Sequence, residues 1–285
     1  MQSVVKSKLA LILTVILFCG FSFRNNSEVK PAKILTQMFD SIKGIKTLRQ
    51  SVHAIERIEN HFNTSFSEIK LQTSPRKLYY HNKLKKIEIL YNAETSLHKA
   101  YVKPHVFPYL TLSLDPSGNI MRKNQHYSIN ELGYDFIGKS VALTIKKDKD
   151  GINKFTYLGK VVKNGYTCYF LEYENKSYNY TPYVVGDRET ASLISYKLCV
   201  NDYLLRNKNN LLNEFGYIKK GSVLHVPTLY CQKAILYIDE RLMLPVCLSL
   251  YDDAGLFESY EYTGIELNKP FQKEEFTKDY KGYGF

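Results

Sequence analysis

The stretch that organises this sequence is residues 183–227, YVVGDRETASLISYKLCVNDYLLRNKNNLLNEFGYIKKGSVLHVP. It opens with a β-favouring run and a Gly186-Asp187 turn, where the Asp can cap a following helix. Two short segments then carry leucines and other apolar residues at helical spacing, and a turn at Gly221 leads into an alternating run that Pro227 stops. The stretch therefore predicts the order strand, helix, helix, strand.

That order resembles the LysM cell-wall-binding module. The resemblance rests on Gly186-Asp187, on Asn209 after the second helical segment and on Gly221 before the last strand. It implies that peptidoglycan or another N-acetylglucosamine glycan binds in a shallow groove lined by Gly186, Asp187, Arg188 and Asn209. The family's usual Thr after Gly-Asp is Arg188 here, and the alternative is a structural βααβ unit without a ligand.

The first 24 residues have the pattern of a secretory signal peptide. Lys6 and Lys8 form a positive segment, and residues 9–18 form an apolar run too short to span a bilayer comfortably. The signal predicts export to the periplasm or cell envelope of a Gram-negative bacterium. Cys19 leaves lipoprotein anchoring open, and an uncleaved membrane anchor is the third alternative.

The composition is basic and rich in tyrosine. The chain has 285 residues, 39 Lys and Arg against 28 Asp and Glu, 24 Tyr and no Trp. The formal net charge of +11 suits anionic partners such as lipid headgroups or wall polymers, although charge spread along the chain is also typical of a solvated surface. Export argues against nucleic acid as the partner.

On both sides of the organising stretch, short apolar segments alternate with turns, which predicts an antiparallel meander. An amphipathic helix is expected from Pro31 to Gly44, and a second helix is expected from a capping box at Ser128 and Glu131 onward. The expected strands are 47–62, 64–72, 77–81, 86–92, 97–103, 109–114, 155–162, 166–174, 234–239, 244–250 and 256–267.

The segments SPRKLY (74–79), IEILYN (87–92), LSLDPSG (112–118) and GLFESYEY (255–262) resemble a secreted bacterial domain family of unknown function. The architecture of that family is similar to the LolA and LolB lipoprotein carriers. The resemblance implies an α+β fold in which helices cover a curved antiparallel sheet, a half-barrel. The implied domains are the signal peptide at 1–24, the half-barrel at 31–174 plus 229–285, and an inserted LysM-like module at 181–228.

An open half-barrel leaves an apolar mouth that can take a lipid or a lipoprotein acyl chain. Alternation along the strands selects six candidate cavity residues: Tyr79, Ile89, Tyr91, Leu112, Leu236 and Leu248. The alternative is a structural wall-binding protein whose barrel is filled with its own Tyr and Phe side chains. Both hypotheses predict a non-enzymatic envelope protein, with membrane association possible in either case.

Sequence motifs for catalysis are missing. The seven histidines show no HExxH motif, and GxSxG and phosphate-binding glycine motifs do not occur, so no metal, cofactor or catalytic residue is predicted. His126 is expected to be a hydrogen-bonded structural residue rather than a catalytic one. Glu258 and Glu261 are expected to point away from Tyr260 as solvated carboxylates.

Four cysteines follow the signal segment: Cys168, Cys199, Cys231 and Cys247. No CxxC pair occurs, so a cysteine metal cluster is not expected. The sequence predicts either buried apolar residues or one or two disulfides, whose pairing it does not determine.

Overall fold

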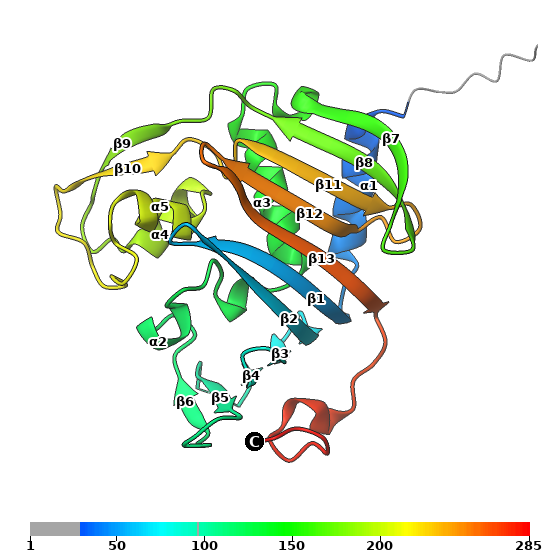
Figure 1. The fold of residues 1–285 in the computed structure, drawn as a ribbon, viewed down its shortest axis with the longest axis vertical. Coiled ribbons are helices and arrows are strands. Elements are labelled where there is room, and N and C mark those ends of the chain that lie inside the picture. The colour runs from blue at the N-terminus through cyan, green and yellow to red at the C-terminus, as the bar shows by residue number, and fades with distance from the viewer. Residues whose placement is uncertain (1–28, 96) are drawn as a thin grey trace, which may run out of the picture.

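The structure is a computed structural model that describes residues 29–95 and 97–285. A curved, open antiparallel sheet of eleven strands runs in the order β6-β5-β4-β3-β2-β1-β13-β12-β11-β8-β7, and β9 and β10 form a separate two-stranded sheet (Figure 1). The predicted α+β fold, a curved antiparallel sheet covered by helices, is confirmed. The strands are β1 (Thr47–Ile58), β2 (His61–Gln72), β3 (Lys77–Asn82), β4 (Ile87–Asn92), β5 (Ala100–Pro104), β6 (Leu112–Leu114), β7 (Phe155–Lys163), β8 (Tyr166–Glu174), β9 (Tyr180–Val184), β10 (Val223–Pro227), β11 (Lys233–Asp239), β12 (Pro245–Asp252) and β13 (Gly255–Leu267).

Helices cover one face of the large sheet, which we call the inner face (Figure 1). The buried Ile34, Leu35 and Met38 of α1 and the buried Tyr134 of α3 belong to the same apolar core as the inward-facing strand residues. The α-helices are α1 (Pro31–Lys43), α2 (Asn119–Arg122), α3 (Tyr134–Lys147), α4 (Ala191–Leu198) and α5 (Asp202–Lys208), and the 3-10 helices are η1 (Ile129–Glu131), η2 (Gly151–Lys154) and η3 (Lys273–Phe276).

The second predicted helix is divided in two. The capping box is present, because the Ser128 hydroxyl accepts from the Asn130 amide and Glu131 accepts from the Ser128 amide, but it caps only the single turn of η1. Gly133 then adopts a φ of 115°, which L side chains rarely reach, and a Cβ at this position would lie 2.6 Å from Leu71 Cδ2. The chain therefore turns at Gly133 and starts α3 one residue later.

The organising stretch has the predicted order of elements. β9 pairs with β10, and α4 and α5 lie between them in the chain, so that residues 180–227 form a βααβ unit with a small apolar core of its own. One detail of the prediction is wrong. Asp187 does not cap the first helix, because α4 begins at Ala191 and the Thr190 hydroxyl accepts from the Leu193 amide.

The C-terminal segment lies against the opposite, outer face of β2, β3 and β4. Phe276 is buried with Tyr79 and Leu90, and Tyr283 stacks on Tyr79 with ring centroids 3.7 Å apart. The Glu275 carboxylate accepts hydrogen bonds from Arg49 and Lys70 of the same face, at 2.9 and 2.8 Å. The end of the chain is therefore part of the fold rather than a free tail.

The predicted signal peptide and Cys19 lie outside the described residues. Within 29–95 and 97–285, no helix is long and apolar enough to cross a membrane. The four remaining cysteines are free thiols, and Cys168, Cys231 and Cys247 are buried. Cys199 is partly exposed at the end of α4, so the structure matches the alternative of buried apolar residues for the other three cysteines.

Candidate functional site

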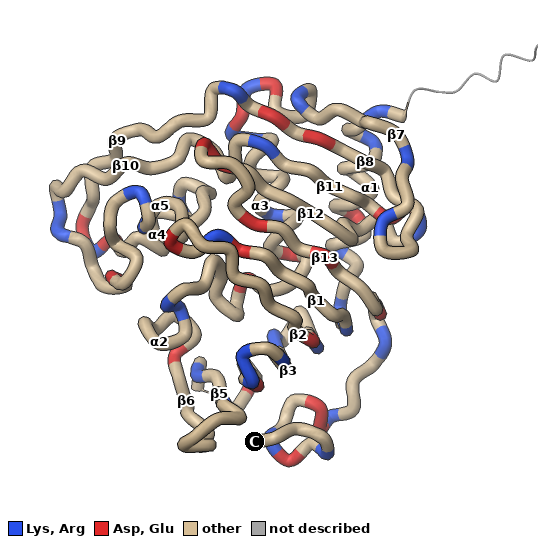
Figure 2. The backbone as a smooth tube through the Cα atoms, in the orientation of Figure 1, with Lys and Arg blue, Asp and Glu red and all other residues tan. Residues whose placement is uncertain are grey.

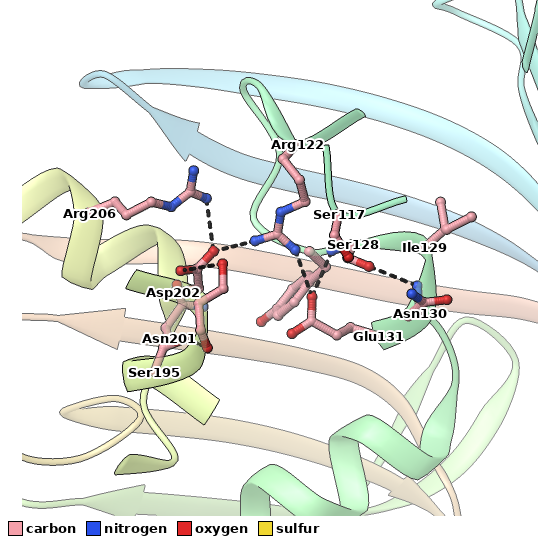
Figure 3. Close-up of polar contacts among 12 residues, drawn as sticks. Ser117, Arg122, Ser128, Ile129, Asn130, Glu131, Ser195, Asn201, Asp202 and Arg206 are labelled. Atoms are coloured by element: carbon pink, nitrogen blue, oxygen red, sulfur yellow. Dashed lines mark hydrogen bonds and ion pairs between the residues drawn. The ribbon is translucent and has the colours of Figure 1, made fainter. Parts of the chain in front are cut away.

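A cleft of about 410 Å³, lined by both polar and apolar side chains, separates the large sheet and its helices from the βααβ unit. One wall comes from α2, η1 and α3, and the other comes from α4, α5 and the turn between them, as Figure 3 shows for the labelled polar side chains. Five serines and two asparagines line it: Ser117, Ser128, Ser140, Ser192, Ser195, Asn130 and Asn201. A cleft of this volume falls within the ordinary size range of small-molecule sites.

Arg122 ties the two walls together. It lies at the end of α2 and is 5% exposed, its Nη1 donates to Glu131 Oε2 at 3.1 Å, and its Nη2 donates to Asp202 of α5 (Figure 3). Asp202 Oδ2 also lies 3.0 Å from Nη2 of the buried Arg206. Burial lowers the pKa of Arg206, and Asp202 opposes this effect. The Arg122 Nε is a buried donor that has no hydrogen-bond partner among the described residues.

A second network lies under the cleft and centres on Glu258, which is fully buried on β13. His126 Nδ1 lies 2.8 Å from Glu258 Oε2, and the Tyr127 hydroxyl donates to Glu258 Oε1. The Tyr127 hydroxyl is also 2.7 Å from the Tyr230 hydroxyl, which accepts from Asn201 Nδ2 at 3.2 Å. Strand β13 and the cap of α5 are thereby connected through buried polar groups.

The pKa values of His126 and Glu258 are both raised in the folded protein. Burial acts to lower the pKa of His126, but the hydrogen bond with Glu258 and the charges of Glu56 and Glu258 outweigh it and raise the pKa. Burial raises the pKa of Glu258, and the hydrogen bonds from His126 and Tyr127 only partly oppose this. Both shifts keep the proton on the pair to higher pH. The prediction that His126 is a hydrogen-bonded residue agrees with this geometry.

The expectation for Glu258 is wrong. Glu258 and Tyr260 are two residues apart on one strand and share the inner face, and the Tyr260 hydroxyl lies 3.4 Å from Glu258 Oε2. Only Glu261 points to the other face, where it is partly exposed beside Lys163. Period-two alternation puts Glu258 on the same face of the strand as Tyr260, which is the face that the helices cover.

Ligand atoms of Glu56, His126 and Glu258 lie within 4.8 Å of one another, which is close enough to consider a metal ion. These atoms already bond to neighbours. His126 binds Glu258 through Nδ1 and the Arg57 carbonyl oxygen through Nε2, and Glu56 accepts from the Tyr260 hydroxyl at 2.5 Å. A metal ion would have to break these bonds, so the cluster fits a hydrogen-bonded core better than a metal centre.

An apolar cavity of about 110 Å³ lies next to the cleft, between α3 and the inner face of the sheet. Its lining includes Val52, Ile69, Ile137, Val141, Ala234, Leu236, Leu248 and Tyr262. Tyr127, Phe136 and Tyr230, together with the polar Glu131 and Ser140, line both the cavity and the cleft. The rings of Tyr127 and Phe136 meet edge to face with centroids 5.1 Å apart. These three aromatic side chains, with Glu131 and Ser140, form the partition between the apolar cavity and the cleft.

The six predicted cavity residues do not lie together. Leu236 and Leu248 line the cavity, and Ile89 and Tyr91 are buried elsewhere in the main core. Leu112 is 42% exposed on β6. The choice of Tyr79 is wrong: it pairs with Leu90 while Tyr91 pairs with Leu78, so Tyr79 points to the outer face. Alternation could not reveal which face of β3 the helices cover, because both faces of this strand carry buried residues.

The four predicted glycan residues lie in and near the βααβ unit's loops. Asp187 and Arg188 are exposed between β9 and α4, and the Gly186 amide donates to Glu189 Oε2 at 2.7 Å. Asn209 ends α5, and its amide group bonds to both the amide and the carbonyl of His225, at 2.7 and 2.8 Å. Asn209 thus joins α5 to β10, and its side chain is occupied within the protein.

Sequence reasoning missed Arg122, Tyr127, Glu131, Phe136, Asp202 and Tyr230. These residues come from separate segments that meet only in the folded chain, so local spacing gave no signal for most of them. The exception was the capping box, which correctly marked Glu131 as a residue bonded at a helix start.

No protein-family model matches the chain, and comparison with curated proteins found no match. Among solved structures, the chain is similar to Mycobacterium tuberculosis lipoprotein LppX, with 11% identity, a TM-score of 0.41 and coverage of 85% of this chain and 97% of that one. It is similar to LprF from Mycobacterium bovis, with 12% identity, a TM-score of 0.42 and coverage of 85% and 94%. A LolA superfamily protein from Nitrosomonas europaea shows 12% identity, a TM-score of 0.32 and coverage of 88% and 99%. These low scores describe a distant likeness of architecture only.

Proposed function

We propose that this protein is a non-enzymatic binding protein for an amphiphilic ligand, a lipid or a lipoprotein acyl group, in the cell envelope. The acyl chain enters the cavity beneath α3, and the polar head occupies the cleft beside the βααβ unit. The observation that carries the proposal is the shared partition of Tyr127, Phe136 and Tyr230, which puts the two compartments in contact. A single ligand with one apolar and one polar end matches that arrangement.

The cavity is small. At about 110 Å³ it is smaller than the roughly 150 Å³ cavity that takes up one benzene molecule. A long acyl chain therefore enters only when the aromatic partition swings aside or α3 moves away from the sheet. The apolar side chains around the cavity are closely packed, so an entering ligand has to replace some of them.

The cleft favours a head group that makes many hydrogen bonds. Its lining offers the hydroxyl groups of five serines and the side-chain amide groups of Asn130 and Asn201. Its charged side chains have both signs, with Arg122 and Lys139 facing Glu131, Asp135 and Asp202. A hydroxyl-bearing or amide-bearing head satisfies these groups better than a bare apolar end.

A dansyl-labelled fatty acid tests the apolar compartment. We expect its fluorescence to rise on binding, and we expect Ala234→Leu, which fills the cavity, to weaken binding at least tenfold. Ala142→Leu makes the same change on the exposed side of α3 and serves as the matched control. Equal binding by both variants, or no binding by the unaltered protein, would contradict the proposal.

The second candidate is a structural wall-binding protein with a filled half-barrel and no lipid ligand. The small volume of the cavity favours it, and the βααβ order of residues 180–227 is the feature that suggests peptidoglycan as the partner. The exposed Asp187 and Arg188 are the residues of the predicted glycan set that remain free to reach a sugar. Co-sedimentation with purified peptidoglycan that is lost in Asp187→Ala/Arg188→Ala, together with no binding of the fatty-acid probe, would favour this candidate.

A further inference from the structure

The loop between β5 and β6 exposes an unusual run of apolar side chains. Val106, Phe107, Tyr109 and Leu110 are 46%, 86%, 59% and 60% exposed, and Leu112 at the start of β6 is 42% exposed. Soluble proteins rarely leave such a contiguous patch in water, and patches of this kind mark sites that bind a membrane or another protein. We call residues 105–112 the apolar loop.

Lysines border the apolar loop. The turn between β3 and β4 lies beside it, because the His105 amide donates to the Lys86 carbonyl oxygen at 2.8 Å. Lys85 and Lys86 are exposed in that turn and form no ion pair with the described residues. From the other side, Lys103 Nζ donates to the Tyr109 carbonyl oxygen at 2.7 Å and so lies at the base of the loop.

Surface carboxylates do not neutralise this border. Residues 104–114 contain no Asp or Glu, and the tube of this segment at the lower edge of Figure 2 carries no acidic residue. Glu88, on the neighbouring strand, is 4% exposed, and its two oxygens accept from His105 and from the Gly284 amide. Glu68 is more exposed but pairs with Lys83. Lys85, Lys86 and Lys103 are therefore left as an unpaired cationic rim.

We propose that the apolar loop docks on the surface of an anionic lipid bilayer. Phe107, Leu110 and Val106 enter the boundary between headgroups and acyl chains, and Tyr109 sits at headgroup level, where amphipathic aromatic rings are favoured. The lysine rim contacts lipid phosphates, which a protein with a net charge of +11 approaches readily. A protein partner would match the apolar patch, but the exposed Lys85 and Lys86 beside it, which form no ion pair with the described residues, favour an anionic bilayer. The inference goes beyond the proposed ligand and does not depend on it.

Co-sedimentation with vesicles of phosphatidylglycerol and phosphatidylcholine tests the docking. We expect Phe107→Ser/Leu110→Ser to lower the partition coefficient at least about tenfold, because each withdrawn side chain removes a large apolar area from the bilayer. Lys85→Gln/Lys86→Gln should lower it roughly 30-fold at low salt, because each lysine near an anionic surface adds to the attraction. Val162→Ser removes a residue that is 75% exposed on β7, at the opposite edge of the sheet, and should leave binding unchanged. All variants keep residues 1–28, so the apolar N-terminal run contributes equally to each.

The absence of Trp from the sequence provides a second readout. Tyr109→Trp places a single indole in the apolar loop, and we expect its emission to shift to the blue on addition of anionic vesicles and to be quenched by brominated lipids. Val162→Trp should show neither change. The proposal would be overturned if the loop variants bound vesicles like the unaltered protein, if pure phosphatidylcholine bound equally well, or if the Trp at position 109 were insensitive to lipid. Dimers in light scattering that disappear in Phe107→Ser/Leu110→Ser would assign the patch to a second copy and would also overturn it.

Discussion

Aromatic side chains cover both the outer and the inner face of the large sheet, but the two faces differ in how much unfilled space remains beside these side chains. On the outer face, Tyr283 stacks on Tyr79 at 3.7 Å and its hydroxyl donates to the Glu275 carbonyl oxygen at 3.0 Å. On the inner face, the tyrosines beside α3 bond to the buried carboxylate of Glu258, and a cavity of about 110 Å³ remains next to them. The outer cover is a packed part of the core, whereas the inner cover borders a cavity, which is where we propose that a ligand enters.

Glu258→Leu should produce the largest loss of stability. It leaves His126 and Tyr127 without their buried acceptor, which we expect to lower the free energy of unfolding by about 3–5 kcal/mol. Urea unfolding measures the change. Glu261→Gln, on the opposite face of the same strand, is the control and should change it by less than about 1 kcal/mol. Equal effects of the two variants would contradict the role given to the buried network.

Tyr283→Ala breaks the cover of the outer face. Loss of the ring stack and of one hydrogen bond should lower the free energy of unfolding by about 2 kcal/mol. Binding of the fatty-acid probe should stay within about twofold of the unaltered protein, because the cavity lies on the other face. Tyr217→Ala, at a residue that is 71% exposed, is the matched control and should alter stability by less than about 0.5 kcal/mol. Loss of probe binding in Tyr283→Ala would show that the two faces are not independent.

The pH dependence of stability should come in part from the inner face. The pKa of His126 is raised in the folded protein, so its contribution is fully present below the ordinary histidine pKa of 6.5 and is lost as the pH rises through the raised value. The raised pKa of Glu258 acts in the same direction. Thermal unfolding between pH 6 and pH 9 should show a fall in Tm that is reduced in His126→Gln. An unchanged slope in that variant would contradict the assignment.

Lys139→Met should have the smallest effect. Lys139 Nζ lies 3.8 Å from the centroid of the Tyr196 ring, a contact that reaches from α3 across the cleft to α4. Such exposed contacts contribute about 0.5–1 kcal/mol, so we expect a loss of stability no larger than this. A loss above about 2 kcal/mol would mean that Lys139 holds the cleft walls together more strongly than this contact explains.

Much of the fold could be predicted because its signals are local. Alternation gave nearly all strands of the meander, and the capping box at Ser128 gave the start of η1. The break before α3 could not be predicted, because it depends on the approach of Gly133 to Leu71, a residue far away in the sequence.

The candidate site was harder to predict because it depends on which face is covered. Leu236 and Leu248 were placed at the cavity, but Tyr79 was assigned to the wrong face, since the C-terminal segment buries the outer face as thoroughly as the helices bury the inner one. Period-two alternation separates the two faces of a strand, but it does not show which part of the protein packs against each face. Arg122 and Asp202, which are 80 residues apart, could only be brought together by the folded chain.

The most direct test of the central claim is native mass spectrometry of the protein purified without detergent from a bacterium that exports it. The account predicts a bound species whose mass matches an acyl-bearing lipid at one copy per protein, and predicts its loss in Ala234→Leu but not in Ala142→Leu. A ligand-free mass for the unaltered protein, in preparations that preserve lipid binding in known carriers, would contradict the account and favour a filled structural half-barrel.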